Sequence, residues 1–405
     1  MVSDIKRRTL LVGAGAGALG ALGIVSPAAA WDWSSTGSVA GSGNGADPAW
    51  VWDPQADTIV ASLYANGQVD LVNSLLENWT RNDQPLPVGL PADLHDFIEQ
   101  ARQLPSWVDQ AKLAKAFDFY TRKGLYLGVL YGMGSGMMSC AIPREARAVY
   151  YSAGGADMKD RIAKTATLGY DIGEQDAYAG SGSMIVTCIK TRLVHAAVRH
   201  LLPQSNHWQG AADETIPISQ ADIMVTWHSL ATFAYNKIKA WKIKMTSAEA
   251  DAFLHLWQIT AHMLGVEDQY IPATWATANT QSTYIVDPIL APTYEGKQLS
   301  KELMNLAAEY DQGMTKPMMH AFARYTLGNQ IADWIAVPRE PAMDAFVSMG
   351  WPPFVAFREG MSYMPWAPPG YWTFDEFLRL AVLFFLGEGQ DININLPSHN
   401  NPNYD

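Results

Sequence analysis

Apolar residues recur every three or four positions from about residue 55 onward, the spacing that places them on one face of an α-helix. No set of segments alternates apolar and polar residues at every second position, as half-buried strands do. The pattern therefore predicts an all-α fold. The expected helices cover roughly residues 55–66, 68–79, 91–102, 108–138, 143–153, 157–169, 174–202, 219–242, 246–264, 296–312 and 316–335.

Two stretches depart from this helical pattern. Residues 31–54 are rich in Gly, Ser, Asp, Trp and Pro and are expected to form an extended arm, whereas residues 337–372 are interrupted by prolines among aromatic residues. A final helix is expected near residues 374–387, before a polar tail. Because no internal repeat is present, residues 55–405 are expected to form a single helical domain.

The N-terminus has the pattern of an export signal. Basic residues including Arg7 and Arg8 precede a short apolar stretch and an A-x-A cleavage pattern that ends at Ala30. The arginine pair resembles a twin-arginine signal, whose pathway exports folded proteins. We therefore expect residues 1–30 to be removed and the mature protein to be secreted and extracellular. The glycines Gly15, Gly17 and Gly20 have the spacing of a dinucleotide-binding turn. The second strand and the acidic residue that such a unit requires do not follow them, which argues against that interpretation.

The composition is that of a folded protein with few charges, since 48% of its 405 residues are hydrophobic and 17% are charged. A formal net charge of −12 disfavours nucleic acid and anionic membranes as partners. The apolar run at 377–387 is too short to span a bilayer, so we expect no membrane span. We also expect the protein to be a monomer. Fifteen Trp, 17 Tyr and 17 Met suit either a large core or an apolar ligand channel.

Missing motifs exclude several kinds of active site. No H-E-x-x-H, E-x-x-H or G-x-S-x-G occurs, which argues against a zincin, a ferritin-like di-iron oxygenase and a nucleophile-elbow hydrolase. Without C-x-x-C-H, covalent attachment of a c-type haem is excluded. Cys140 and Cys188 either form a disulfide or remain buried free thiols, and the sequence leaves this open.

Arg192, His195 and Arg199 share one face of the helix expected over 174–202. A lone histidine is most often a core or interface residue whose ring nitrogens are satisfied. The flanking arginines favour another interpretation, because they attract an anionic group while a neutral imidazole can bind a metal. Haem, which carries propionates and iron, fits such a helix face.

Arg161, Lys164 and Thr165 form a polar stripe on the helix expected over 157–169. Charged stripes usually face water, and Asp157 and Asp160 lie one turn away as possible partners. The alternative is that the stripe lines a site.

Glu145 lies in the first turn of a helix that Pro143 is expected to begin. Such a carboxylate usually complements the helix dipole. If it is buried with a raised pKa, it becomes a usable general base.

These residues in this order resemble the latex clearing proteins, a family of secreted haem-dependent rubber oxygenases. The resemblance rests on Glu145, on Arg161-x-x-Lys164-Thr165 and on His195 within TRLVHAAVRH. It extends over most of the mature chain and is strongest over residues 115–265.

The resemblance implies a globin-like helical core with additional helices and one non-covalent haem b. His195 would be the proximal iron ligand, and Lys164 a displaceable distal ligand. A lysine binds iron only as the neutral amine, so this role requires a buried and largely uncharged Lys164.

The resemblance also implies the substrate, poly(cis-1,4-isoprene), which would be cleaved internally at double bonds by O2 to oligomers with aldehyde and ketone ends. Glu145 would take an allylic proton, while Arg161 and Thr165 would shape the distal pocket. The remaining positions that match the family, with expected roles in holding the haem and its helix, are Arg192, Arg199, His228 and Arg324.

Two other functions remain open from the sequence. One is a secreted haem-binding or sensing protein of the same fold without oxygenase activity, which needs His195 and Lys164 but not Glu145. The other is an exported scaffold or polymer-binding protein with no cofactor.

Overall fold

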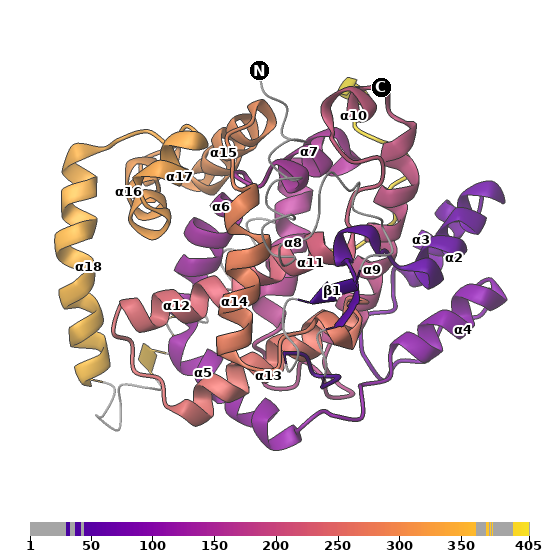
Figure 1. Ribbon diagram of the computed structural model, residues 1–405, viewed down its shortest axis with the longest axis horizontal. Helices are drawn as coiled ribbons and strands as arrows, with labels where there is room; N and C mark the ends of the chain where they lie inside the picture. Colours follow the sequence, from indigo (N-terminus) through magenta and orange to yellow (C-terminus); the bar gives the residue numbers. More distant parts are fainter. Residues whose placement is uncertain are drawn as a thin grey trace, which may run out of the picture.

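The computed structural model describes residues 30–32, 37–41, 44–361, 370, 371, 373, 375 and 392–404. Residues 1–29 of the expected export signal and most of the helix expected at 374–387 lie outside the described residues. Helices make up nearly all of the regular structure, so the predicted all-α class is confirmed (Figure 1). Within the described ranges the strands are β1 (Ala30–Asp32) and β2 (Asn44–Ala46), which pair antiparallel in the expected extended arm.

The helices follow most of the predicted pattern, with boundaries shifted by a few residues. Two predicted helices, at 108–138 and 219–242, each contain a π-helical segment, η2 (Leu130–Gly136) and η5 (His228–Thr232). The α-helices are α2 (Pro54–Ala65), α3 (Val69–Leu76), α4 (Ala92–Ala101), α5 (Gln110–Val129), α6 (Met137–Ser139), α7 (Pro143–Tyr151), α8 (Met158–Asp171), α9 (Met184–Leu201), α10 (Asn206–Ala211), α11 (Gln220–Trp227), α12 (Phe233–Ala240), α13 (Ser247–Met263), α14 (Trp275–Ile285), α15 (Tyr294–Ala307), α16 (Lys316–Leu327), α17 (Asn329–Trp334) and α18 (Pro341–Met361).

Polar side chains begin several of these helices. Asp53 and Asp109 accept hydrogen bonds from free backbone N–H groups at the starts of α2 and α5. Ser219 and Thr246 form capping boxes with the acidic residues three positions later, at the starts of α11 and α13. A cap of this kind stabilises a helix by about 1 kcal/mol.

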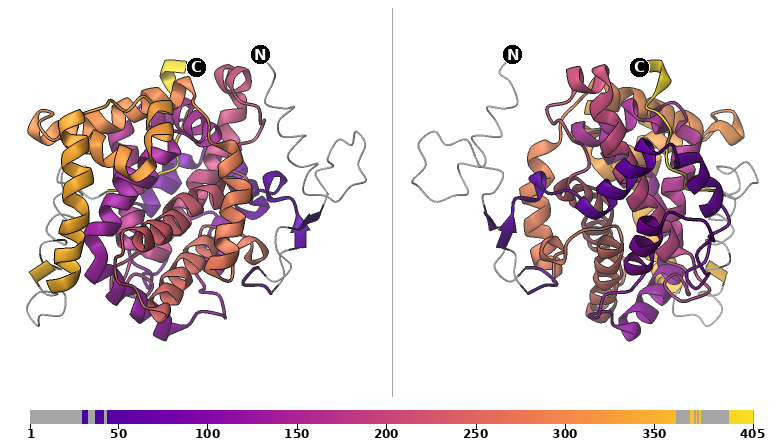
Figure 2. Two further views of the ribbon diagram at one scale, coloured as in Figure 1. Left: turned by 60° about the vertical axis from the view of Figure 1, so that its left-hand side comes forward. Right: turned by 90° about the vertical axis from the view of Figure 1, so that its right-hand side faces the viewer.

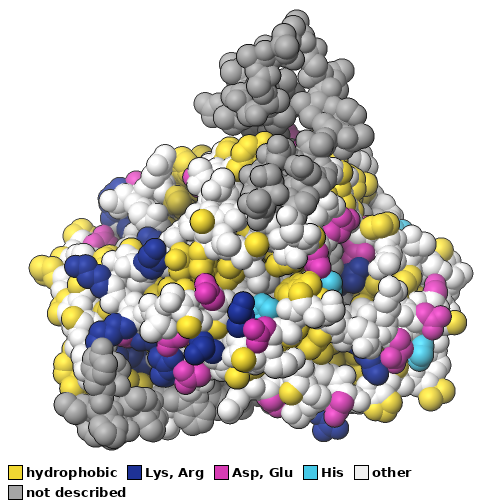
Figure 3. Space-filling model, turned by 60° about the horizontal axis from the view of Figure 1, so that its bottom comes forward, with side chains coloured by type: hydrophobic (Ala, Val, Ile, Leu, Met, Phe, Trp, Pro, Cys, Tyr) yellow, Lys and Arg dark blue, Asp and Glu magenta, His cyan; other side chains and the backbone are white. Residues whose placement is uncertain are grey.

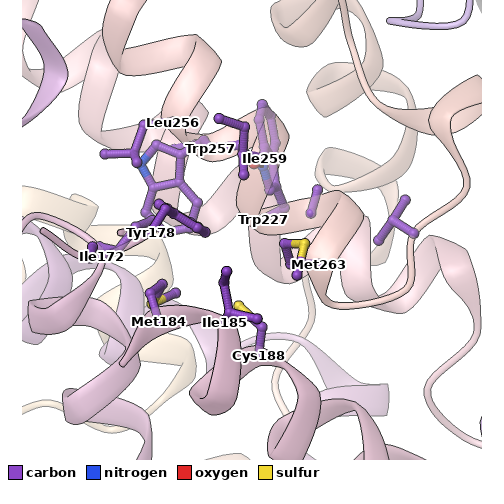
Figure 4. Close-up of a cluster of buried hydrophobic side chains, with 14 of the residues drawn as sticks. Ile172, Tyr178, Met184, Ile185, Cys188, Trp227, Leu256, Trp257, Ile259 and Met263 are labelled. Atoms are coloured by element: carbon purple, nitrogen blue, oxygen red, sulfur yellow. Dashed lines mark hydrogen bonds between the residues drawn. The ribbon is translucent and has the colours of Figure 1, made fainter. Parts of the chain in front are cut away.

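Helix α13 lies in the centre of the molecule and is buried on most of its faces. Its side chains meet those of α9 in a cluster that includes Met184, Cys188, Trp257 and Met263 (Figure 4). The indole N–H of Trp227 donates to the Trp257 carbonyl at 2.7 Å, which satisfies a buried polar group within this apolar cluster. The core therefore holds α9, the helix of His195, from one side.

The two π-helical segments pack against each other. Ser135 in η2 donates its hydroxyl to the Ser229 carbonyl in η5 at 2.5 Å. A Cβ atom at Gly134 would collide with the Phe233 ring, so glycine permits this approach. π-Helical segments within α-helices often occur near functional sites. The segment η5 begins with His228, one of the candidate site residues.

Helix α18 overturns the expectation that prolines break the chain between 337 and 372. It runs over 21 residues with Pro352 and Pro353 inside it. An internal proline removes a helix hydrogen bond, but burial of Val347, Trp351 and Val355 along one face compensates for that loss. The helix packs on α16 and forms an outer layer of the molecule (Figures 1 and 2).

Both cysteines are buried and free, so the structure contains no disulfide between Cys140 and Cys188. Among the described helices, none by itself has the length and apolar character needed to cross a membrane. A sharply bent pair, Gln110–Ser139 with Pro143–Tyr151, meets those criteria only when its two parts are taken together.

Candidate functional site

His195 lies in the second half of α9, between two arginines that tie this helix to α2. Arg192 forms a two-pronged ion pair with Asp53, in which Nη2 lies 2.9 Å from Oδ1. One turn further along α2, Asp57 accepts from Arg199 Nε at 2.7 Å. The predicted role of these arginines in holding the helix therefore has a direct structural basis. Their predicted contact with a cofactor stays a prediction.

The imidazole of His195 is held in its neutral form. Burial lowers its pKa to about 3, and the positive charges of Arg199 and Arg161 add to that effect. Its Nδ1 atom is buried and has no hydrogen-bond partner in the described part of the chain. A neutral imidazole with an unsatisfied nitrogen is the form that binds a metal.

Arg161 comes from α8 and points inward. Its guanidinium is close enough to interact electrostatically with both His195 and Glu145. Burial lowers the pKa of Arg161, and the Glu145 carboxylate opposes that shift. The turn at Ala153–Gly155 lies directly beneath it, because a Cβ atom at Gly154 would be 3.0 Å from Arg161 Cδ.

Glu145 lies in the first turn of α7 and reaches Thr226 on α11. The Thr226 hydroxyl donates to Glu145 Oε1 at 2.5 Å. The pKa of Glu145 is raised to about 7, chiefly by burial. The Thr226 hydrogen bond and Arg161 oppose that rise, and Asp222 contributes to it. Residue Glu145 as a whole keeps some accessible surface. A carboxyl that titrates near neutral pH can accept or return a proton.

Lys164 pairs with an acidic residue of its own helix. Its Nζ atom lies 2.6 Å from Asp160 Oδ2, and its side chain is 27% exposed. The predicted role of Lys164 as a displaceable iron ligand stays a prediction. Thr165 is also exposed, and its hydroxyl donates to the Arg161 carbonyl at 3.0 Å. Asp160 can reach Lys164 because it lies one turn away on the same face of α8. Arg161 alone of the stripe turns inward.

His228 is buried in η5 and uses both ring nitrogens within the protein. Nδ1 is 2.7 Å from Thr232 Oγ1, and Nε2 is 2.9 Å from Gln281 Oε1. Burial lowers its pKa to about 3, so the ring is neutral. These contacts join η5 to α14, whereas the predicted contact of His228 with a cofactor stays a prediction.

Arg324 on α16 directs its donors to the segment that follows that helix. Nη1 donates to Asn329 Oδ1 at 3.0 Å, Nε to the Pro338 carbonyl at 2.9 Å, and Nη2 to the Val337 carbonyl at 2.6 Å. An ion pair of Nη2 with Asp333 completes the set. The side chain therefore fastens α17 and the segment that follows it to α16, and its predicted cofactor role stays a prediction.

The structure brings Glu145, Arg161 and His195 together from three helices, and it adds residues that the sequence analysis did not single out. Asp53 and Asp57 could have been suspected, because acidic residues at the start of a proline-led helix are natural partners for arginines. Thr226 has no such signal, since a single threonine between Val225 and Trp227 belongs to no motif.

A site of several clustered metal ligands is absent from the described residues, which contain no group of three or more His, Cys, Asp or Glu that could hold a metal ion. The candidate ligand is therefore a single imidazole. Haem needs no more than one or two protein ligands.

Comparisons with known proteins agree on one family. Residues 121–359 match the family described as "ER-bound oxygenase mpaB/B'/Rubber oxygenase, catalytic domain". The chain is 56% identical over 401 residues to the "Rubber oxygenase" of Streptomyces sp. (strain K30), which covers 98% of each chain. It is also similar to the solved structure of "Latex Clearing Protein LCP in the closed state", at 57% identity and a TM-score of 0.83, which covers 91% of this chain and all of that one.

Proposed function

The chain belongs to the family of mpaB/B′ oxygenases and rubber oxygenases, and we propose that it is a haem b-dependent dioxygenase that cleaves double bonds inside poly(cis-1,4-isoprene). The observation that carries this proposal is the meeting of three side chains in a member of this family. The Arg161 guanidinium lies within electrostatic range of both the neutral imidazole of His195 and the Glu145 carboxyl, whose pKa burial raises to about 7.

The side chains at this site fit haem. His195 would hold the iron, because its ring is neutral and its buried Nδ1 is unsatisfied. Arg199 Nη2 is a second buried atom without a hydrogen-bond partner, and it suits a propionate. Lys164 would have to leave Asp160 before it could serve as a distal ligand. When bound, haem supplies the binding and activation of O2.

The overall reaction fixes what the protein must do with protons. Cleavage of one C=C bond by O2 places one oxygen atom in a ketone end and the other in an aldehyde end, and it consumes no other reactant. Every hydrogen of the substrate is retained in the products. An allylic proton taken by Glu145 must therefore be returned, and a carboxyl with a pKa of about 7 can do both at neutral pH. Arg161 favours the ionised form that accepts the proton.

Polyisoprene offers no hydrogen-bonding group, so its affinity must come from burial of apolar surface, at roughly 25 cal/mol per Å². The abundance of Trp, Tyr and Met suits that task. Because a high polymer cannot enter a cell, we propose that the enzyme acts outside it. The Arg7-Arg8 pair and the A-x-A pattern support export by the twin-arginine route.

The test is the absorption spectrum of the purified protein together with its activity on rubber latex. A Soret band and the release of oligomers with carbonyl ends are expected. His195→Ala should lose the band, whereas His95→Ala, which removes a half-exposed imidazole on α4, should keep it. A protein that stays colourless after addition of haem contradicts the proposal.

Glu145→Gln separates the oxygenase from a haem-binding or sensing protein. The amide has the same shape but cannot take up a proton, so latex cleavage should fall at least a hundredfold while the Soret band remains. Full cleavage by this variant would remove Glu145 from the mechanism.

A further inference from the structure

Thr226 is the one residue among those described that donates a hydrogen bond to the Glu145 carboxyl, at 2.5 Å from Oε1. We infer that Thr226 is a positioning residue that aims Glu145 as the base of the oxygenase reaction. This inference rests on the proposed function. Thr226 lies on a different helix from Glu145, α11, and it would act on the reaction only through Glu145.

The location of Thr226 relative to Glu145 is fixed by ion pairs on either side. Arg144, the neighbour of Glu145, binds Asp222 Oδ2 through Nη2 at 3.1 Å and Glu214 Oε1 through Nε at 3.1 Å. Asp222 lies one turn before Thr226 on α11 and also caps that helix by accepting from Ser219. The start of α7 is therefore joined to α11 at two points, Arg144–Asp222 in the first turn of α11 and Glu145–Thr226 near its end.

Burial along α11 shows that Thr226 lies on the exposed side of this helix. Its sequence neighbours Val225 and Trp227 are both buried, whereas Thr226 itself is exposed. A threonine needed only to fill space would be buried with them. Its hydroxyl instead spans from the Asp222 carbonyl of its own helix, at 3.3 Å, to the carboxyl on α7.

The hydrogen bond leaves one carboxyl oxygen available for chemistry. Thr226 engages Oε1, and Oε2 of Glu145 has no donor among the described side chains. A carboxylate held by one oxygen has its second oxygen set in a defined direction. Thr226 thus orients the proton-accepting oxygen and, by donating to the ionised form, favours ionisation.

The charged and titratable groups that face Glu145 come from three sides. Arg161 on α8 favours the ionised carboxyl, and Asp222 on α11 disfavours it. The buried Cys140 thiol after α6 also lies within electrostatic range. Arg144, on the same helix as Glu145, is occupied by its two carboxylate partners. Removal of the Thr226 hydroxyl leaves all of these in place.

The test compares Thr226→Val, which keeps the shape and loses the hydroxyl, with Thr226→Ser, which keeps the hydroxyl. Oxygen uptake on latex is measured against pH for both holoenzymes. Loss of one hydrogen bond to the carboxylate should move the acidic limb of the profile upward by about one pH unit in the valine variant. The rate below that limb should fall about tenfold, and serine should restore the wild-type profile.

A second readout does not depend on turnover. The infrared band of the protonated Glu145 carboxyl, identified by its loss in Glu145→Gln, should titrate at higher pH in Thr226→Val than in the wild type and in Thr226→Ser. The Soret band and the melting temperature should be alike in all three, because Thr226 is exposed and makes no contact with His195.

The outcomes separate this inference from the proposed function. If Glu145→Gln is inactive while Thr226→Val keeps the wild-type pH profile and carboxyl titration, the positioning role is wrong and the proposed function stands. If Glu145→Gln cleaves latex fully, the base itself is wrong. If valine and serine slow the enzyme equally at every pH, the effect is one of packing, and the inference is overturned.

Discussion

At the scale of single residues, the placement of Arg161 depends on the absence of a side chain at Gly154. A methyl group there would lie 3.0 Å from Arg161 Cδ and 3.3 Å from Nη1, closer than ordinary contacts. Gly154→Ala should displace the guanidinium and lower latex cleavage about tenfold, because small displacements of catalytic groups are costly. The measurement is the initial rate of oxygen uptake.

Gly169→Ala on the same helix as Arg161 is the matched control for Gly154→Ala. Nothing lies within 4 Å of a methyl group at Gly169, so activity should be unchanged. The helix should gain about 0.5–1 kcal/mol of stability, since alanine has the better helix propensity. Full activity of Gly154→Ala would show that the contact with Arg161 can relax.

The polar stripe on α8 shows what spacing along one helix can and cannot predict. Helical periodicity correctly placed Arg161, Lys164 and Thr165 on neighbouring positions of one face. It could not predict that residues of this one face have different surroundings. Arg161 interacts electrostatically with Glu145, whereas Lys164 pairs with Asp160. That division depends on the turn at Ala153–Gly155 packing beneath Arg161, which is a tertiary contact.

At the scale of elements, the two faces of α18 should contribute unequally to the stability of the protein. Trp351 is 8% exposed, and its ring meets those of Tyr126, Trp241 and Phe322 at centroid distances of 6.1, 5.3 and 5.1 Å. Trp351→Ala should lower the free energy of unfolding by about 3–5 kcal/mol through the cavity it leaves. Phe357→Ser, at a position that is 64% exposed, should change it by no more than about 0.5 kcal/mol.

Denaturant titration of both variants measures these free energies. Equal losses at the two positions would mean that the outer face of α18 is covered by other parts of the protein.

Element boundaries were predictable where local signals decide them and not elsewhere. A proline in the first turn sets the starts of α2 and α7 close to their expected positions, and in α2 the cap by Asp53 adds to it. The helix expected over 174–202 begins only at Met184, because Asn82, more than a hundred positions earlier, binds the backbone at its start. Asn82 accepts from Ile185 N and donates to the Ala177 carbonyl, which holds a turn where periodicity alone predicted helix.

At the scale of the whole molecule, stability should depend on pH through its buried imidazoles. In the folded state the pKa of His228 is about 3, whereas in an unfolded chain it returns to about 6.5. As the pH falls below 6.5 the unfolded state takes up a proton that the folded state does not, so stability is lost progressively down to about pH 3.

His228→Gln cannot take up that proton. Its unfolding free energy should therefore fall less steeply with acid, by up to about 1.4 kcal/mol per pH unit, although the variant is less stable at neutral pH. Urea titrations at several pH values between 4 and 7 give the two slopes. Parallel curves for wild type and variant would contradict the neutral state of His228.

The charged side chains on the face seen in Figure 3 should add little to the pH dependence of stability. Basic side chains gather over one part of it, while acidic and apolar side chains are spread across the rest. Such solvated charges contribute small and salt-screened energies. Buried groups, whose ionisation differs most between folded and unfolded chains, dominate the pH dependence.

The segment at 396–404 has a consequence for the order in which the protein folds. The Leu396 backbone forms two hydrogen bonds, each 2.9 Å long, with the side chain of Asn73 in α3. Asn401 then binds the carbonyls of Tyr150 and Tyr151 at the end of α7. These pairs lie about 250 to 320 positions apart along the chain, so they close very long loops. The end of the helix that carries Glu145 therefore gains its hydrogen bonds to Asn401 only after residues 396–404 have been synthesised, whereas its start is joined to α11 by Arg144 and Glu145.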